Sequence, residues 1–127
     1  MNPFSHVDLR VTDIDAALQF YARLMPVLGF TREFHGEQWK VFASEDALPR
    51  TAYFAFTEDP GHRPNANRIA FWAESREAVD RAAAVLRKTG ATITGGPRIY
   101  QEYSASYYAV YFTDPSGNPL EIVHRTD

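Results

Sequence analysis

The sequence predicts an α+β fold in which one βαβββ unit occurs twice. Both halves contain a strand-like segment, then an amphipathic helix, then three further strand-like segments. In both halves the helix is preceded by a capping residue and followed by glycine. Setting His6 against Arg68 aligns strand with strand and helix with helix, and it brings Leu24 onto Leu86. The repeated order of elements, more than the few identities, indicates an internal repeat.

The first half starts with an alternating segment, HVDLRV (residues 6–11), which is typical of a half-buried strand. The next segment has helical apolar spacing, with Thr12 or Asp13 as its cap and with Pro26 and Gly29 marking its end. Three strand-like segments follow, TREFHG, QWKVFAS and RTAYFAF.

The second half follows a segment rich in proline and glycine, TEDPGHRPNAN, which predicts a connection without regular structure. RIAFWA is an expected strand, and the helix after it is capped by Ser75 and ends before Gly90. Three more strands are expected in TITGGPRIY, SYYAVYFT and NPLEIVHR, with DPSG as a type I turn between the last two. The prediction is one domain over 1–127, made of unit one (4–57), a linker (58–66) and unit two (67–125).

Composition excludes several classes of function. The net charge is −3 and there is no basic block, which argues against nucleic acid as a partner. No apolar run approaches the length of a membrane span, and no signal peptide is recognisable. The chain has no cysteine, so disulfides, thiolate metal sites and cysteine nucleophiles are excluded. We therefore expect a cytoplasmic protein with no membrane partner.

Glu121 is the unusual residue, because it stands in the middle of the apolar final strand. A buried carboxylate requires a cation, a proton or a metal ion beside it. A metal would favour an enzyme, whereas an arginine or a hydroxyl would suit a binding protein or a structural ion pair.

The chain resembles the vicinal oxygen chelate superfamily, which includes glyoxalase I, extradiol dioxygenases, and fosfomycin and bleomycin resistance proteins. The resemblance rests on the doubled βαβββ order, on HVDLRVTDIDAALQFYARLMPVLGF and on YFTDPSGNPLEIVH. It implies two units that form a curved, barrel-like mixed sheet with outer helices. It also implies a homodimer that acts on a small-molecule ligand.

The resemblance implies a divalent metal, Fe, Mn, Ni, Co or Zn, held by His and Glu side chains. His6 matches the ligand of the first strand, and Glu121 matches the ligand of the last strand. Arg68 stands where the second unit should supply His, and RTAYFAF places Tyr53 or Phe54 where the first unit can supply Glu. The expected metal site is therefore incomplete.

Two hypotheses follow. In the first, the protein is a metal-dependent lyase or dioxygenase, in which His6 and Glu121 hold the metal with water or His62 as a third ligand. Glu121 then doubles as the catalytic proton acceptor, and Arg68 binds an anionic group of the substrate. In the second, it is a metal-free ligand-binding protein like the bleomycin resistance proteins, and Arg68 and Glu121 form an ion pair. His124 is a poor metal ligand in either case, because strand alternation places it opposite Glu121.

Aromatic residues supply the remaining candidates. Five of the seven tyrosines lie between Tyr100 and Tyr111, in a region that the resemblance identifies as a mouth or lid. Tyr103, Tyr107 and Trp72 are the residues that we expect, with Arg68, to contact the substrate.

Overall fold

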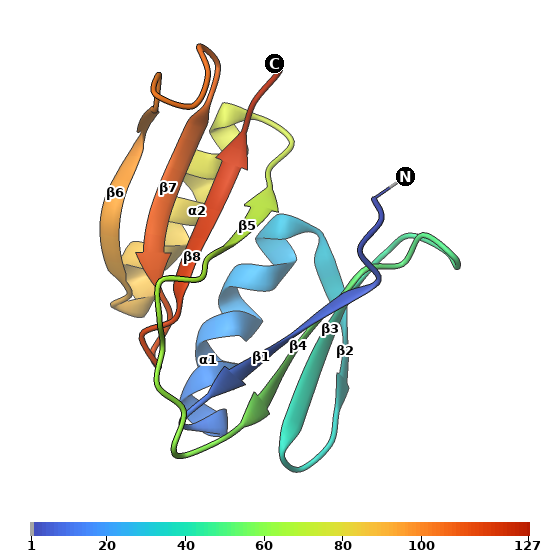
Figure 1. Ribbon diagram of the computed structural model, residues 1–127. Helices are drawn as coiled ribbons and strands as arrows, with labels where there is room; N and C mark the ends of the chain where they lie inside the picture. The colour runs from blue at the N-terminus through green and yellow to red at the C-terminus, as the bar shows by residue number, and fades with distance from the viewer. Residues whose placement is uncertain (1) are drawn as a thin grey trace. The chain divides into compact units, whose positions relative to one another are not determined.

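The computed structural model describes residues 2–127 and confirms the α+β class and the doubled order of elements (Figure 1). The chain divides into two compact units, of which unit 1 ends at Arg63 and unit 2 spans Pro64–Asp127. This division lies inside the predicted linker.

Each unit has a four-stranded mixed sheet with one helix. The elements of unit 1 are β1 (His6–Val11), α1 (Ile14–Leu24), β2 (Phe30–His35), β3 (Trp39–Ser44) and β4 (Tyr53–Glu58). Those of unit 2 are β5 (Ile69–Trp72), α2 (Arg76–Thr89), β6 (Thr92–Ile99), β7 (Tyr108–Thr113) and β8 (Pro119–His124).

The two sheets have the same topology, which confirms that the repeat in the sequence is a repeat in the structure. The strand order is β1-β4-β3-β2 in unit 1 and β5-β8-β7-β6 in unit 2. In each sheet the first strand of the unit runs parallel to the last strand, and the other pairs are antiparallel.

The helices begin and end where the sequence predicts. The Asp13 side chain accepts hydrogen bonds from two backbone N–H groups at the start of α1, and the Ser75 hydroxyl accepts one at the start of α2. α2 ends at Gly90, whose φ of 73° is left-handed. α1 ends at Leu24 and continues into a short 3-10 helix, Met25–Leu28.

Each helix covers one face of its own sheet. α2 packs on β6, β7 and β8 and buries its apolar side, Ala78, Val79, Ala82, Ala83 and Leu86. The other face of this sheet, which we call the open face of unit 2, carries the cross-strand sets Gly95, Tyr111, Glu121, Ala70 and Arg98, Ala109, Val123, Trp72. Among residues 2–127, no helix is long and apolar enough to cross a membrane.

Candidate functional site

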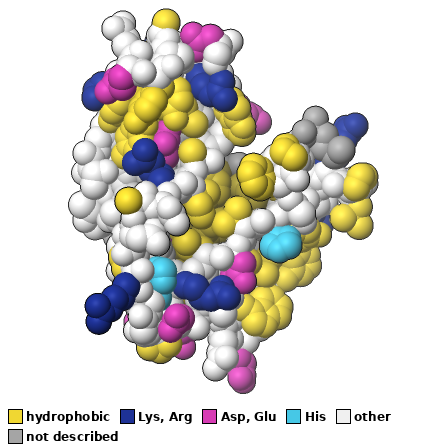
Figure 2. All heavy atoms as spheres, viewed as in Figure 1, with side chains coloured by type: hydrophobic (Ala, Val, Ile, Leu, Met, Phe, Trp, Pro, Cys, Tyr) yellow, Lys and Arg dark blue, Asp and Glu magenta, His cyan; other side chains and the backbone are white. Residues whose placement is uncertain are grey.

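Glu121 lies at the centre of the open face of unit 2, with only 3% of its surface exposed. It is in the middle of β8, paired with Ala70 of β5 on one side and with Tyr111 of β7 on the other. Larger side chains of the same unit gather over it. Figure 2 shows charged atoms set among hydrophobic side chains over this part of the sheet. The carboxylate is thus part of a small core on the side of the sheet away from α2.

Both oxygens of the Glu121 carboxylate have a partner within unit 2. The Arg68 Nε atom is 3.4 Å from Oε1, and the Tyr107 hydroxyl donates a hydrogen bond to Oε2. A cation and a hydroxyl therefore satisfy the buried carboxylate, and two of the residues named from the sequence, Arg68 and Tyr107, contact it directly.

Arg68 also lies on an aromatic ring. Its guanidinium carbon is 4.7 Å from the centre of the Tyr111 ring, a distance typical of a cation–π contact. The Arg68 side chain is 42% exposed, and its terminal amino groups make no hydrogen bond to any residue that the structure describes. Arg68 thus holds Glu121 through Nε and presents its other N–H donors to solvent.

The Tyr111 hydroxyl is buried and has no hydrogen-bond partner among residues 2–127. Burial raises the pKa of this phenol, and the negative charge of Glu121 raises that pKa further. The neighbouring Tyr107 hydroxyl also raises this pKa, but its oxygen is not placed to accept a complete hydrogen bond from Tyr111. Tyr111 was not among the site residues predicted from the sequence.

Tyr107 provides a test of this arrangement through its ionisation. Burial, and then the hydrogen bond to Glu121, raise the pKa of Tyr107 to about 12. An unfolded tyrosine loses its proton near pH 10. Because the pKa is higher in the folded state, the contribution of Tyr107 to the free energy of unfolding is fully present below pH 10. It is lost as the pH rises from 10 towards 12. We expect the free energy of unfolding, measured in urea at several pH values, to fall over this range.

Tyr107→Phe should reduce that fall, because one of the phenols whose pKa differs between the folded and unfolded states is gone. Tyr108→Phe is the comparison variant for a tyrosine whose pKa does not depend on contact with Glu121. The pKa of Tyr108 is raised chiefly by its hydrogen bond to Asp80 of α2. Equal pH dependence in the wild type and in Tyr107→Phe would contradict the contact between Tyr107 and Glu121.

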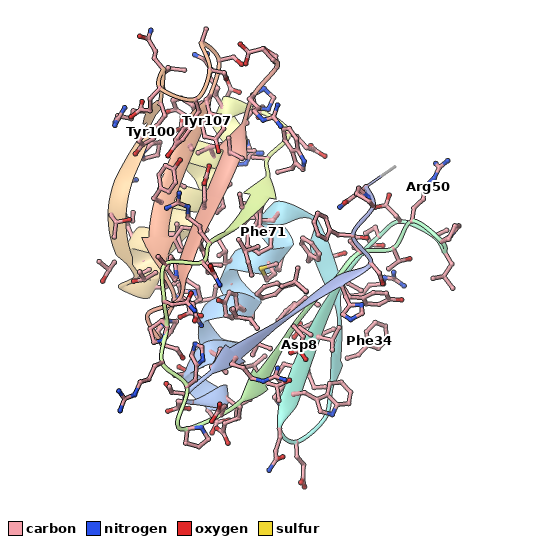
Figure 3. The ribbon with its side chains drawn as sticks, in the orientation of Figure 1. Asp8, Phe34, Arg50, Phe71, Tyr100 and Tyr107 are labelled. Carbon is pink, nitrogen blue, oxygen red and sulfur yellow. The ribbon has the colours of Figure 1, made fainter. Side chains whose placement is uncertain are left out.

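The loop between β6 and β7 carries Tyr100, Tyr103 and Tyr107, of which Figure 3 labels the first and the last. The rings of Tyr103 and Tyr107 have their centres 5.0 Å apart, and Tyr103 is 58% exposed. Ser104 and Ser106 both donate hydrogen bonds to the Asp127 side chain. The segment after β8 therefore holds this loop in place.

Trp72 lies on the open face of unit 2 but does not contact Glu121. Its ring is 59% exposed, and the guanidinium carbon of Arg125 is 4.8 Å from the ring centre. His124 lies on the opposite face, as predicted, with its Nδ1 atom 3.0 Å from the backbone oxygen of Ala73.

The predicted metal ligand of unit 1, His6, begins β1 and is exposed. Its Nδ1 atom is 3.1 Å from the Ser5 hydroxyl, while Nε2 has no partner among the described residues. Asp8 and Arg10, on the same face of β1, form an ion pair of 2.9 Å with each other.

The strand register corrects one expectation about unit 1. Asp8 of β1 pairs with Ala55 of β4, just as Ala70 of β5 pairs with Glu121 of β8. Because Asp8 and Ala70 are equivalent in the repeat, the counterpart of Glu121 is Ala55. The expectation of Tyr53 or Phe54 at this position is therefore wrong, and the methyl group of alanine cannot bind a metal.

The donor set within either unit does not fit a resident metal ion. Neither residues 2–63 nor residues 64–127 bring together three His, Cys, Asp or Glu side chains that could hold one. In unit 2, Glu121 is the carboxylate of the open face, and both of its oxygens are engaged by Arg68 and Tyr107. An arginine has no lone pair to offer a metal.

The fold and sequence are similar to proteins of known structure. A glyoxalase/bleomycin resistance protein from Albidiferax ferrireducens is 26% identical, with a TM-score of 0.79 and coverage of 98% of this chain and 100% of that one. The fosfomycin resistance protein FosX from Mesorhizobium loti is 21% identical, with a TM-score of 0.71 over 99% and 94% of the two chains.

A FosX variant from Listeria monocytogenes, solved with Mn(II) and 1S,2S-dihydroxypropylphosphonic acid, is 20% identical. It has a TM-score of 0.72 over 99% of this chain and 92% of its own. At these identities the two FosX structures support the fold alone. No curated protein matches the sequence significantly. The profile of the Glyoxalase/Bleomycin resistance protein/Dioxygenase superfamily matches residues 4–122, and the chain belongs to that superfamily.

Proposed function

We propose that this protein binds a small organic molecule on the open face of unit 2 without a resident metal ion. The observation that carries the proposal is the pairing of Arg68 with Glu121. Arg68 stands where the resemblance implies a histidine ligand, and its guanidinium group takes the place beside the carboxylate that a metal ion would take. Glu121 then serves to orient Arg68, and Arg68 serves to bind the ligand.

The surroundings of this pair support a binding role. The open face of unit 2 combines a few polar groups with aromatic walls, which is the usual composition of a small-molecule site. Tyr107 and Tyr111 lie beside Glu121, while Trp72 and Tyr103 leave large parts of their rings exposed. A homodimer and a cytoplasmic location are also part of this proposal.

A second candidate is the metal-dependent lyase or dioxygenase. Its support is the free Nε2 atom of His6, together with the structure of FosX from Listeria monocytogenes, which was solved with Mn(II). Bound to His6 and Glu121, the metal would supply Lewis acid chemistry to a substrate. This candidate requires Glu121 to exchange its present partners for the metal, and we therefore rank it second.

Metal titration decides between the two candidates. We expect protein purified without a His-tag to take up far less than one metal per chain when titrated with Mn, Fe(II), Ni, Co or Zn and measured by calorimetry and elemental analysis. The reason is that Arg68 and Tyr107 already engage the Glu121 carboxylate.

The proposal would be contradicted if the wild type bound nearly one metal ion per chain and both Glu121→Ala and His6→Ala abolished this binding. His35→Ala is the matched control, because His35 is another histidine of unit 1 and pairs with Glu33 away from β1. Uptake that depends on His6 and Glu121 but is unchanged in His35→Ala would replace our proposal with the enzyme.

A further inference from the structure

We propose that the ligand of this face is an organic anion, a carboxylate carried on a flat apolar group, and that Arg68 and the Tyr111 hydroxyl bind its charged end. This inference rests on the proposed function, because it assigns a chemical class to the ligand of the same site. Four features of unit 2 support it: the charge of the open face, the free donors of Arg68, the unpartnered hydroxyl of Tyr111 and two exposed rings.

The charge of the open face favours an anion. The guanidinium carbon of Arg98 is 3.7 Å from the centre of the Tyr100 ring, and that ring meets Tyr111 edge to face at 4.9 Å. Arg68 lies over Tyr111 in turn. Two arginines thus lie over a pair of tyrosines on the face that carries the buried carboxylate of Glu121.

Asp127 is a further acidic residue of unit 2. The Asp127 carboxylate accepts hydrogen bonds from Ser104 and Ser106, and these bonds lower the pKa of Asp127. These two hydrogen bonds hold the Asp127 carboxylate at the loop between β6 and β7. At the exposed end of Arg68, a cationic ligand would meet repulsion from the guanidinium group.

Arg68 has the donors that a carboxylate requires. Glu121 contacts only the Nε atom of Arg68, and the distance from Nε to Oε1 is a long 3.4 Å. The exposed terminal amino groups of Arg68 have no hydrogen-bond partner among residues 2–127. A guanidinium group can hold a carboxylate through two parallel N–H···O bonds, which are stronger than neutral hydrogen bonds. Glu121 repels the ligand carboxylate, so the anion must lie on the solvent side of Arg68.

The Tyr111 hydroxyl supplies a second donor. Tyr111 is 8% exposed, and its hydroxyl is a buried polar atom without a partner, which costs free energy in the absence of a ligand. Tyr107 donates its own proton to Glu121, and its oxygen is not placed to accept a complete hydrogen bond from the Tyr111 hydroxyl. An acceptor oxygen from a ligand can reach the hydroxyl if the exposed end of Arg68 shifts from its position over the ring.

The apolar part of the ligand has exposed rings to pack against. Trp72 and Tyr103 are among the large hydrophobic side chains that remain most exposed, at 59% and 58%. Flat aromatic surfaces of this kind bind flat apolar groups by stacking. An aromatic carboxylate combines the two features that this unit can recognise.

Three probes of nearly equal shape test the charge preference: benzoate, benzamide and benzamidine. Each is titrated into the full chain, and binding is followed by the shifts of backbone amide resonances. We expect benzoate to bind at least tenfold more tightly than benzamide, with saturable shifts at Arg68, Tyr111 and Glu121, and we expect benzamidine to bind most weakly.

Tyr111→Phe should weaken benzoate binding about tenfold, because a hydrogen bond to a charged acceptor is lost while the aromatic ring is kept. Tyr108→Phe is the matched control and should bind benzoate as the wild type does. Tyr108 also lies under an arginine, Arg76 at 5.4 Å, but its hydroxyl donates to Asp80 on the α2 side of the sheet.

Equal affinity for the three probes, a preference for benzamidine, or undiminished benzoate binding by Tyr111→Phe would overturn the assignment of an anion to Arg68 and Tyr111. In those cases a ligand still binds, and the proposed binding function stands. If none of the probes gives saturable shifts in unit 2, both the anion and the binding function are wrong.

Discussion

Arg68→Ala is expected to lower the free energy of unfolding by about 2–4 kcal/mol, which is a large effect for a residue with an exposed side chain. The cause is Glu121, which is 3% exposed in the intact protein and would keep its negative charge with only the Tyr107 hydroxyl as a partner. Removal of one member of a buried pair typically costs about 3–5 kcal/mol. We expect less here because Arg68 is partly exposed and water can enter beside the carboxylate.

Urea unfolding at pH 7 measures this effect, and Arg125→Ala is the matched control. Arg125 also lies over an aromatic ring of unit 2, that of the exposed Trp72, but it has no buried carboxylate to neutralise. Its loss should cost at most about 1 kcal/mol. The double variant Arg68→Met with Glu121→Leu should recover much of the stability, because neither charge then remains.

The comparison of these variants identifies the source of the effect. If Arg68→Ala is as stable as Arg125→Ala, the contact between Arg68 and Glu121 contributes little to the free energy of unfolding. Glu121 would then be held by other groups, and the proposed function would lose the observation on which it rests.

The fold could be predicted almost completely from the sequence because its signals are local. The capping side chains of Asp13 and Ser75, the left-handed Gly90 and the alternation in β1 each depend on a few neighbouring residues. The turn between β7 and β8 is another local signal, with the Gly117 N–H donating to the Asp114 backbone oxygen. These signals repeat, and the topology repeats with them.

The site was only partly predictable, because its contacts join residues that are far apart in the chain. Arg68 and Glu121 are brought together by the parallel pairing of β5 with β8, and nothing in either segment reveals the register of a parallel pair. The same difficulty explains the error in β4, where the expected position differs from Ala55 by only one or two residues. A shift by one residue exchanges the two faces of a strand.

Tyr111 could have been found from the sequence. β7 and β8 form a hairpin in which Thr113 pairs with Pro119, and counting outward from that pair sets Tyr111 opposite Glu121. The hairpin follows from the turn alone. What the sequence could not show is that the Tyr111 hydroxyl has no hydrogen-bond partner, because that depends on how the surrounding side chains are placed in three dimensions.

Tyr21→Ala is expected to have the largest effect on stability, about 3–5 kcal/mol, because it removes an aromatic ring from the centre of unit 1. Tyr21 of α1 is 0% exposed, and its ring centre is within 5.0 Å of the rings of Phe20, Phe54 and Phe56. The surrounding rings cannot collapse fully into the space left behind. Since single domains are stable by only about 5–15 kcal/mol, such a loss is easily measured.

This substitution also tests the prediction that residues 1–127 form one domain, because each unit contains one of the two tryptophans. Trp39 is in unit 1 and Trp72 is in unit 2. With Trp72→Phe the fluorescence reports on unit 1, and with Trp39→Phe it reports on unit 2. If the chain unfolds as one domain, Tyr21→Ala should lower the urea midpoint equally for both reporters.

Leu86→Ala is the reciprocal variant, because Leu86 of α2 is 0% exposed in unit 2, and we expect it to cost about 2–5 kcal/mol. A single domain requires the Trp39 signal to respond to Leu86→Ala as fully as the Trp72 signal does. If each substitution shifts only the reporter of its own unit, the units unfold independently and the prediction of one domain is wrong. In that case the ligand site proposed for unit 2 should persist when unit 1 is unfolded by Tyr21→Ala, because Arg68, Tyr107, Tyr111 and Glu121 all belong to unit 2.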